Sequence, residues 1–313
     1  MKSKEILNKV RPLIGLIIFS VIISILSPRF LTTANLLNVF RQTSINAIIA
    51  AGMTFVILTA GIDLSVGSIL GFSGAIAAKM LSSGMNIWVS LLAAIVIGAL
   101  AGMLNGIIIT KGKVQPFIAT LAIMILLRGL TMVFTNGRPI PVPGASVSSI
   151  FRWIGTGSIW TIPVPVIIMA LVFIVCYYIL NHTKFGRHLY AVGGNEEASL
   201  LSGVNTAKIK ILAYTASGIL AAVAGIIVTS RLSSAQPTSG EGYELDAIAA
   251  VVLGGTSLVG GQGTIIGTII GALIIGILNN ALNLMDVQSY YQMIAKAIVI
   301  LIAVLLDKKE KTK

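Results

Sequence analysis

The chain has 313 residues, of which 56% are hydrophobic and only 10% are charged, with a formal net charge of +12 at pH 7. The apolar residues form continuous blocks, which excludes an ordinary soluble domain and also the alternating segments of a membrane β-barrel. Lys and Arg mostly flank these blocks, so the positive charge favours a positive-inside membrane topology over nucleic-acid binding. We therefore predict an all-α, polytopic helical membrane protein.

The first apolar block follows a basic N-terminus and resembles a signal peptide. Lys2, Lys4, Lys9 and Arg11 precede the apolar stretch 13–26, and no small-residue cleavage pattern follows it. We interpret this block as an uncleaved first helix. We expect about ten transmembrane helices, over residues 12–27, 43–60, 64–81, 87–110, 115–134, 162–181, 211–229, 246–259, 264–285 and 290–306.

The distribution of positive charge predicts the topology. With alternate loops placed on opposite sides, most loop Lys and Arg residues fall on the side of the N-terminus. Both termini are then cytoplasmic, and the number of spans is even. Segments 43–60 and 246–259 each end in a glycine-containing turn rather than a charged loop. If either is re-entrant, eight spans is the alternative.

These two segments also resemble each other, because each runs through alanine and isoleucine into a glycine-containing turn. We expect a single transmembrane domain, 1–313, with a candidate internal repeat of 44–134 and 211–306; chance similarity between helices of small residues is the alternative. Repeats in transporters place broken helices near the transport pathway. The pathway candidates are Asp63, Ser65, Gly67, Gly254, Gly255, Thr256 and Ser257.

Asp63, Arg128 and Lys296 are ionisable residues that lie within or beside predicted spans. Asp63 directly precedes a helix, so N-capping is the simpler role, with pathway lining or gating as the alternative. Arg128 lies about 20 Å along the span 115–134, and we expect its side chain to snorkel to the outer interface. Lys296 lies in the last span. The sequence indicates no partner for either cation.

The residues carry no catalytic or metal-binding constellation. Both histidines, His182 and His188, lie in one basic segment, 182–210, and no paired-ligand spacing is present. No glycine-rich loop ending in Gly-Lys-Ser/Thr is present either. We predict that the chain is not an enzyme, needs no metal or cofactor and does not hydrolyse nucleotide.

Segment 182–210 predicts a short cytoplasmic helix. Asn195 is a good N-cap, Glu196 and Glu197 follow in the first turn, and Gly203 suits a helix end. The helix would present Leu200 and Leu201 as an apolar face. A partner protein or the lipid headgroups could cover that face.

Three motifs, in this order, resemble the permease subunits of bacterial sugar ABC importers, and most closely those of the ribose type. They are Gly61 to Ser68, Phe185-Gly186-Arg187 with Ala191 to Asn195, and Leu253 to Thr264. The resemblance covers nearly the whole chain. It implies import of ribose; xylose, galactose, arabinose, autoinducer-2 and nucleosides are the alternatives.

The resemblance also implies partners. These are a cytoplasmic ATPase, typically with two fused nucleotide-binding modules that hold ATP and Mg, an extracytoplasmic sugar-binding protein, and a second permease copy, usually identical. The complex would lie in the bacterial plasma membrane, in contact with lipid and without nucleic acid. The ATPase-coupling element would comprise Gly194, Asn195, Glu196, Glu197, Ala198 and Gly203.

The match to the family's Glu-Ala-Ala-x-x-x-Gly coupling pattern is partial, because Ser199 replaces the second alanine and no Leu-Pro follows. The rival hypothesis is a secondary transporter or channel in which Asp63 binds a coupling ion. It is weakened by the scarcity of buried ionisable residues. A membrane-embedded enzyme is disfavoured because catalytic residues are lacking.

Overall fold

The computed structural model describes residues 2–142 and 145–311, and within them the chain is almost entirely helical. The helices are α1 (Lys2–Leu26), α2 (Thr33–Leu58), α3 (Val66–Ser82), α4 (Ile87–Lys111), α5 (Pro116–Thr135), α6 (Ala145–Thr156), α7 (Val164–His182), α8 (Lys184–Gly194), α9 (Glu196–Leu201), α10 (Thr206–Leu232), α11 (Tyr243–Leu253), α12 (Ile265–Leu284) and α13 (Ser289–Lys311). Two short antiparallel pairs join β1 (Ile140–Pro141) to β4 (Ser234–Ala235) and β2 (Ser158–Ile159) to β3 (Ile162–Pro163).

The prediction of a polytopic helical membrane protein is confirmed, and each of the ten predicted segments contains a helix. Among the described residues, six helices are long and apolar enough to cross a bilayer: α2, α4, α5, α7, α10 and α12. The apolar part of α1, Pro12–Leu26, and helix α3 are shorter. The number of crossings and the side of the termini stay predictions.

Helix α2 lies inside the bundle. Within its most apolar window 83% of the residues are buried, against 28% for α4 and α5. Neighbours of α2 include α7, α10, α11 and α12. The contrast follows from how a membrane bundle is built, since peripheral helices turn apolar side chains towards lipid while a central helix turns them towards other helices.

Small residues bring α10 close to α4. A Cβ atom on Gly218 would collide with the carbonyl of Gly98, and one on Gly102 would collide with the carbonyl of Tyr214. The two backbones therefore touch, and α4 is the most extensive helix partner of α10. In lipid, association between helices depends on such close packing, because burial of apolar surface offers little net gain there.

Two connections interrupt the bundle. Residues 59–65 join α2 to α3, and residues 254–264, which we name the glycine loop, join α11 to α12. Segment 43–60 is mostly the second half of α2, whose 26 residues extend about 39 Å and can cross a bilayer. Segment 246–259 mostly coincides with α11, whose 11 residues extend about 16 Å and cannot cross alone.

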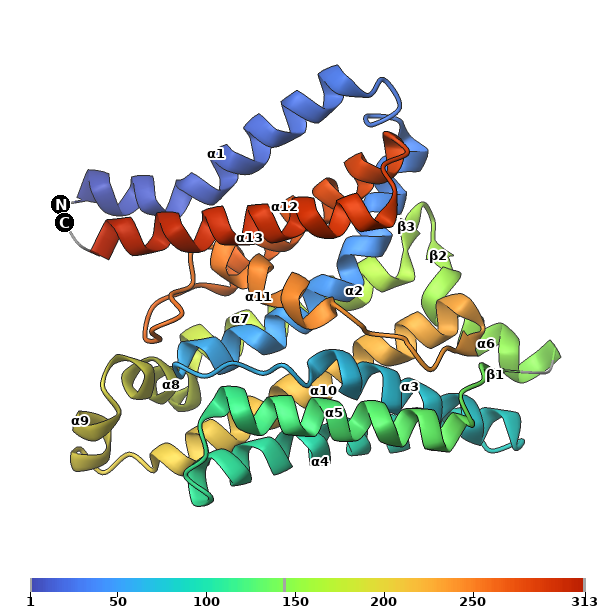
Figure 1. Ribbon diagram of the computed structural model, residues 1–313, viewed down its shortest axis with the longest axis horizontal. Coiled ribbons are helices and arrows are strands. Elements are labelled where there is room, and N and C mark those ends of the chain that lie inside the picture. Colours follow the sequence, from blue (N-terminus) through green and yellow to red (C-terminus); the bar gives the residue numbers. More distant parts are fainter. Residues whose placement is uncertain (1, 143–144, 312–313) are drawn as a thin grey trace.

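Figure 1 shows that the start of α1, the end of α13, and helices α8 and α9 lie at one end of the bundle, while α6 and the short strands lie at the other. This arrangement agrees with the predicted topology. Helix α6 lies outside the ten predicted spans, in residues 136–165, which contain many Pro, Gly and Ser residues.

Candidate functional site

Helices α8 and α9 form the predicted cytoplasmic element, and local capping defines both. The Thr183 hydroxyl accepts a hydrogen bond from the Gly186 amide at 3.2 Å, and the Asn195 side chain accepts one from the Ala198 amide at 2.9 Å. Gly203 follows α9 with a φ of +83°, a left-handed conformation that glycine adopts easily. The predicted cap, helix and helix end are confirmed.

Helix α9 buries one side and exposes the other. Ser199 is buried and donates a hydrogen bond to the Asn195 carbonyl at 2.8 Å. Leu200 and Leu201 are 61% and 89% exposed, and Glu197 and Ala198 are also exposed. Within the described residues, nothing therefore covers either leucine fully.

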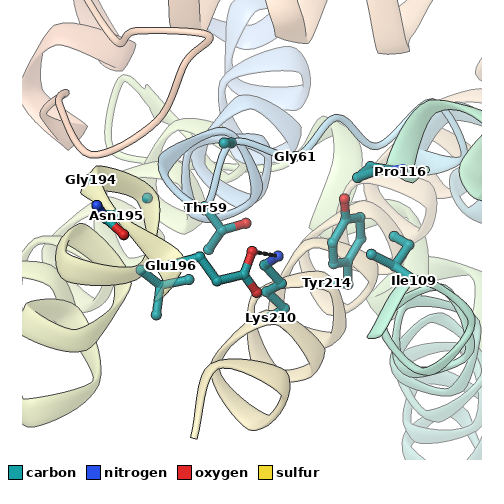
Figure 2. Close-up of a pocket in the computed structure, with 12 residues that line it drawn as sticks. Thr59, Gly61, Ile109, Pro116, Gly194, Asn195, Glu196, Lys210 and Tyr214 are labelled. Carbon is teal, nitrogen blue, oxygen red and sulfur yellow. Dashed lines mark hydrogen bonds and ion pairs between the residues drawn. The ribbon is translucent and has the colours of Figure 1, made fainter. Parts of the chain in front are cut away.

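A cavity of about 320 Å³ lies beside the start of α9. Figure 2 shows Glu196 paired with Lys210 on one side of it, with Tyr214, Ile109 and Pro116 on the other. The carboxylate of Glu196 lies 2.5 Å from the ammonium group of Lys210. The wall is completed by residues at the ends of α2 and α8: Thr59, Ala60, Gly61, Val192, Gly193, Gly194 and Asn195. The start of α9 is therefore tied to Lys210 of α10 at the wall of this cavity.

The end of α8 contacts the end of α2 and the glycine loop through main-chain atoms. The Gly261 amide donates a hydrogen bond to the Leu58 carbonyl at 3.0 Å, and Gly193 packs so closely on that carbonyl that a Cβ would collide with it. The Tyr190 hydroxyl donates to the Gly263 carbonyl at 2.9 Å, and partial burial raises the pKa of this phenol. We name this three-way contact the glycine junction.

Asp63 is completely buried at the start of α3. One carboxylate oxygen accepts hydrogen bonds from the Ser65 amide at 3.0 Å and the Ser65 hydroxyl at 2.6 Å, and the other accepts from the Ser217 hydroxyl at 3.0 Å. Asn105 donates to the Ser65 hydroxyl at 2.8 Å. The expectation that Asp63 caps α3 is therefore wrong, because Ser65 occupies the N-cap position and no side chain caps the helix there. Asp63 instead accepts from the amide and hydroxyl of Ser65, directly before the helix.

The remaining pathway candidates lie in two places. Gly67 of α3 packs against the Gly240 carbonyl and the Glu244 carboxylate. Gly254 packs against the α12 backbone, and Gly255 has a φ of +83°. Thr256 and Ser257 are both buried in the glycine loop.

The structure brings the ends of the two broken segments together, but not all of their polar side chains. Gly260 of the glycine loop packs against Ala60, and Gly261 packs against Gly194 of the predicted coupling element. The Asp63 side chain instead bonds to Ser217 of α10, and its partner Ser65 bonds to Asn105 of α4. Asp63 therefore does not face an open channel in this conformation.

Sequence reasoning missed the partners of the two cations within spans. Arg128 pairs with Glu244 at 2.8 Å and Lys296 pairs with Asp246 at 2.9 Å, so each cation has a carboxylate partner that the sequence did not indicate. The pairs are 116 and 50 residues apart in sequence and could not be identified from helical spacing. The sequence did contain one signal for these partners, namely two carboxylates in one short apolar segment of a chain that has only 10 acidic residues.

Both carboxylates belong to the first turn of α11 and are at most one-tenth exposed. The second Glu244 oxygen is buried without a hydrogen-bond partner. The two pairs therefore hold α11 to α5 and α13. Among the residues that the structure describes, no three His, Cys, Asp or Glu side chains lie together as a metal site.

The chain is similar to proteins of one known family. The family described as "Branched-chain amino acid transport system / permease component" matches residues 35–304. The ribose import permease protein of Haemophilus influenzae is 60% identical over 97% of this chain and 94% of its own length. The corresponding proteins of Escherichia coli K12 and Bacillus subtilis are 56% and 55% identical, over 99% and 97% of this chain and 96% and 94% of their own lengths. No solved structure matches the chain significantly.

Proposed function

Because this chain belongs to the family of permease components of branched-chain amino acid transport systems, we propose that it is the membrane-spanning permease subunit of an ATP-driven importer that carries ribose into the cytoplasm. The observation that carries the proposal is the identity of 55 to 60%, over nearly the full length, to relatives named ribose import permeases. The polytopic helical fold supports it.

The importer needs components that this chain does not supply. ATP and Mg would bind a separate cytoplasmic ATPase with tandem nucleotide-binding modules, and an extracytoplasmic protein would bind ribose and deliver it. A second copy of the permease would complete the pathway in the bacterial plasma membrane. Because the binding protein supplies the affinity for sugar, the permease itself needs only a weak, transient sugar site.

Helix α9 would dock on the ATPase. Its exposed Leu200 and Leu201 form the kind of apolar contact that a protein partner buries, and Glu196 and Glu197 add charge at the helix start. A docked helix transmits force only if it contacts the elements that must move. The glycine junction provides that contact, because α8, directly before α9, touches the end of α2 and the glycine loop.

The translocation step would then take place at the two breaks. Movement of α8 would shift residues 59–65 and the glycine loop, which contact each other at Ala60 and Gly260. Broken helices provide hinges and polar main-chain groups at membrane depth in transporters. The buried Asp63 is best suited to hold the start of α3 during this movement. The two similar breaks also support the proposed repeat within one domain.

The first test is uptake of labelled ribose by cells with and without this chain. We expect deletion to abolish uptake, ATP depletion to stop it, and collapse of the proton gradient at constant ATP to leave it unchanged. Unlabelled xylose, allose and nucleosides should compete poorly. Uptake driven by the gradient alone would contradict ATP coupling and favour the secondary-transporter hypothesis, and strong competition by another sugar would reassign the substrate.

The second test addresses docking. Leu201→Asp places a charge on the most exposed leucine of α9, and we expect it to abolish both ribose uptake and co-purification of the ATPase. Leu201→Met keeps an apolar side chain of similar size and should preserve both. Because Leu201 makes little contact within the chain, the fold and the amount of inserted protein should not change. Normal assembly of Leu201→Asp with the ATPase would refute docking through α9.

A further inference from the structure

A second cavity, of about 320 Å³, is an apolar groove between α7 and α10. Its walls include Cys176 and Ile179 of α7, Ala216 and Ile219 of α10, and two phenylalanines, Phe55 and Phe185. The two aromatic rings stack with centroids 6.2 Å apart. The walls are almost wholly apolar, so water would find few hydrogen-bond partners there.

The groove lies near the end of the bundle that carries α8 and α9. Ile179 is one turn from the end of α7, and Leu212, also in the wall, is in the second turn of α10. Both α7 and α10 are long enough to cross a bilayer. The groove is therefore at the depth of the lipid acyl chains next to one headgroup layer, which the positive-inside topology identifies as cytoplasmic.

Two lysines lie at the same end of the bundle as the groove. Lys208 precedes Leu212 by four residues and thus shares its face of α10, and Lys184 directly precedes Phe185. Both side chains are exposed, and within the described part of the chain neither forms an ion pair with a carboxylate. A groove that excludes water is thus combined with positive charge at headgroup level.

We propose that this groove binds a glycerophospholipid with an anionic headgroup, with an acyl chain between α7 and α10 and the phosphate beside Lys184 and Lys208. The apolar wall matches the chain, and the two lysines match the phosphate. Each cation near an anionic membrane surface strengthens binding about fivefold. Two lysines therefore favour an anionic lipid over a zwitterionic one by about 30-fold.

The bound lipid would support the coupling element, an effect that rests on the proposed function. Phe185, in the groove wall, is the second residue of α8, and the other end of α8 forms the glycine junction. An acyl chain against Phe185 would hold the base of α8 on α2. We therefore expect anionic lipid to increase ribose uptake by the reconstituted importer.

The test measures lipid retention first, because retention does not depend on transport. The purified full-length permease is titrated with phosphatidylglycerol or phosphatidylcholine, and bound lipid is counted by native mass spectrometry. Lys184→Gln with Lys208→Gln should lower affinity for phosphatidylglycerol about 30-fold. The matched control, Lys111→Gln with Lys113→Gln, removes the same charge at the end of α4 and just after it, and should change this affinity little.

A second variant tests the groove itself. Ala216→Phe fills it and should displace the lipid, whereas Ala216→Ser leaves the space open and should retain it. Equal retention of the two lipids by the native chain, or no effect of the paired lysine changes, would overturn the proposal. Disulfide formation between two copies through Ile179→Cys would also overturn it, by showing that a second permease fills the groove. If lipid selectivity persists while ribose uptake fails, only the proposed transport function is refuted.

Discussion

Replacing Asp63 by alanine should cost much more folding free energy than replacing it by asparagine. The carboxylate accepts three hydrogen bonds, two from Ser65 and one from Ser217, and is completely buried. Alanine leaves the Ser65 amide without this acceptor, deprives both hydroxyls of it and opens a small cavity. At about 1 to 3 kcal/mol for each buried unsatisfied group, we expect a loss of about 3 to 5 kcal/mol.

Asparagine retains most of the network. Its carbonyl oxygen can still accept both bonds from Ser65, and its amide can donate to the Ser217 hydroxyl. The weaker bonds are offset by the lower cost of burying a neutral group, so the expected change is about 1 kcal/mol.

The assay is unfolding of the purified permease by SDS in mixed micelles, read as a free energy of unfolding, with ribose uptake measured in parallel. Asp286→Asn makes the same change at an exposed carboxylate and should stay within about 0.5 kcal/mol. Equal losses for Asp63→Ala and Asp63→Asn would refute the hydrogen-bond reasoning. Loss of uptake in a stable Asp63→Asn protein would show that the charge itself is required and would revive the ion-coupling hypothesis.

Two further predictions concern the glycine junction and α11. Gly193→Ala places a methyl group against the Leu58 carbonyl, and this clash of about 1 to 3 kcal/mol should lower ribose uptake about tenfold or more without preventing ATPase co-purification. Gly194→Ala, where a Cβ meets nothing within 4 Å, should transport ribose normally. Equal effects of the two substitutions would contradict coupling through the junction. Glu244→Gln should destabilise the native chain by about 1 kcal/mol more than it destabilises a chain that already carries Arg128→Gln. The expected difference is small because Arg128 is 37% exposed and its pairing is partly screened by solvent. Additive losses in the same unfolding assay would show that the ion pair contributes nothing to stability.

The sequence predicted what depends on local patterns. Apolar blocks located ten helices, because a segment that crosses or enters lipid must be continuously apolar. The cap at Asn195 and the helix end at Gly203 were also predictable, since both rest on preferences of single residues for particular backbone positions.

Contacts between distant segments could not be predicted. The Ser217 partner of Asp63 is 154 residues away, and the Glu244 partner of Arg128 is 116 residues away. The Leu58 carbonyl in the glycine junction belongs to the backbone and leaves no signal in residue type. Helix α6 was hidden by turn-forming residues around it, because its packing against α7 and α10 outweighs weak local preference.

The glycine junction also determines which residues are free to vary. Leu58 contributes its peptide oxygen to the contact, and every amino acid carries the same oxygen. Gly193 and Gly261 contribute the absence of a side chain, a property that no other residue has. Along this contact, a position that contributes only a backbone group should therefore accept many residue types. A position that must leave room for a neighbouring backbone should accept almost none besides glycine. Homologues could change much of the surrounding sequence and keep the same mechanical connection.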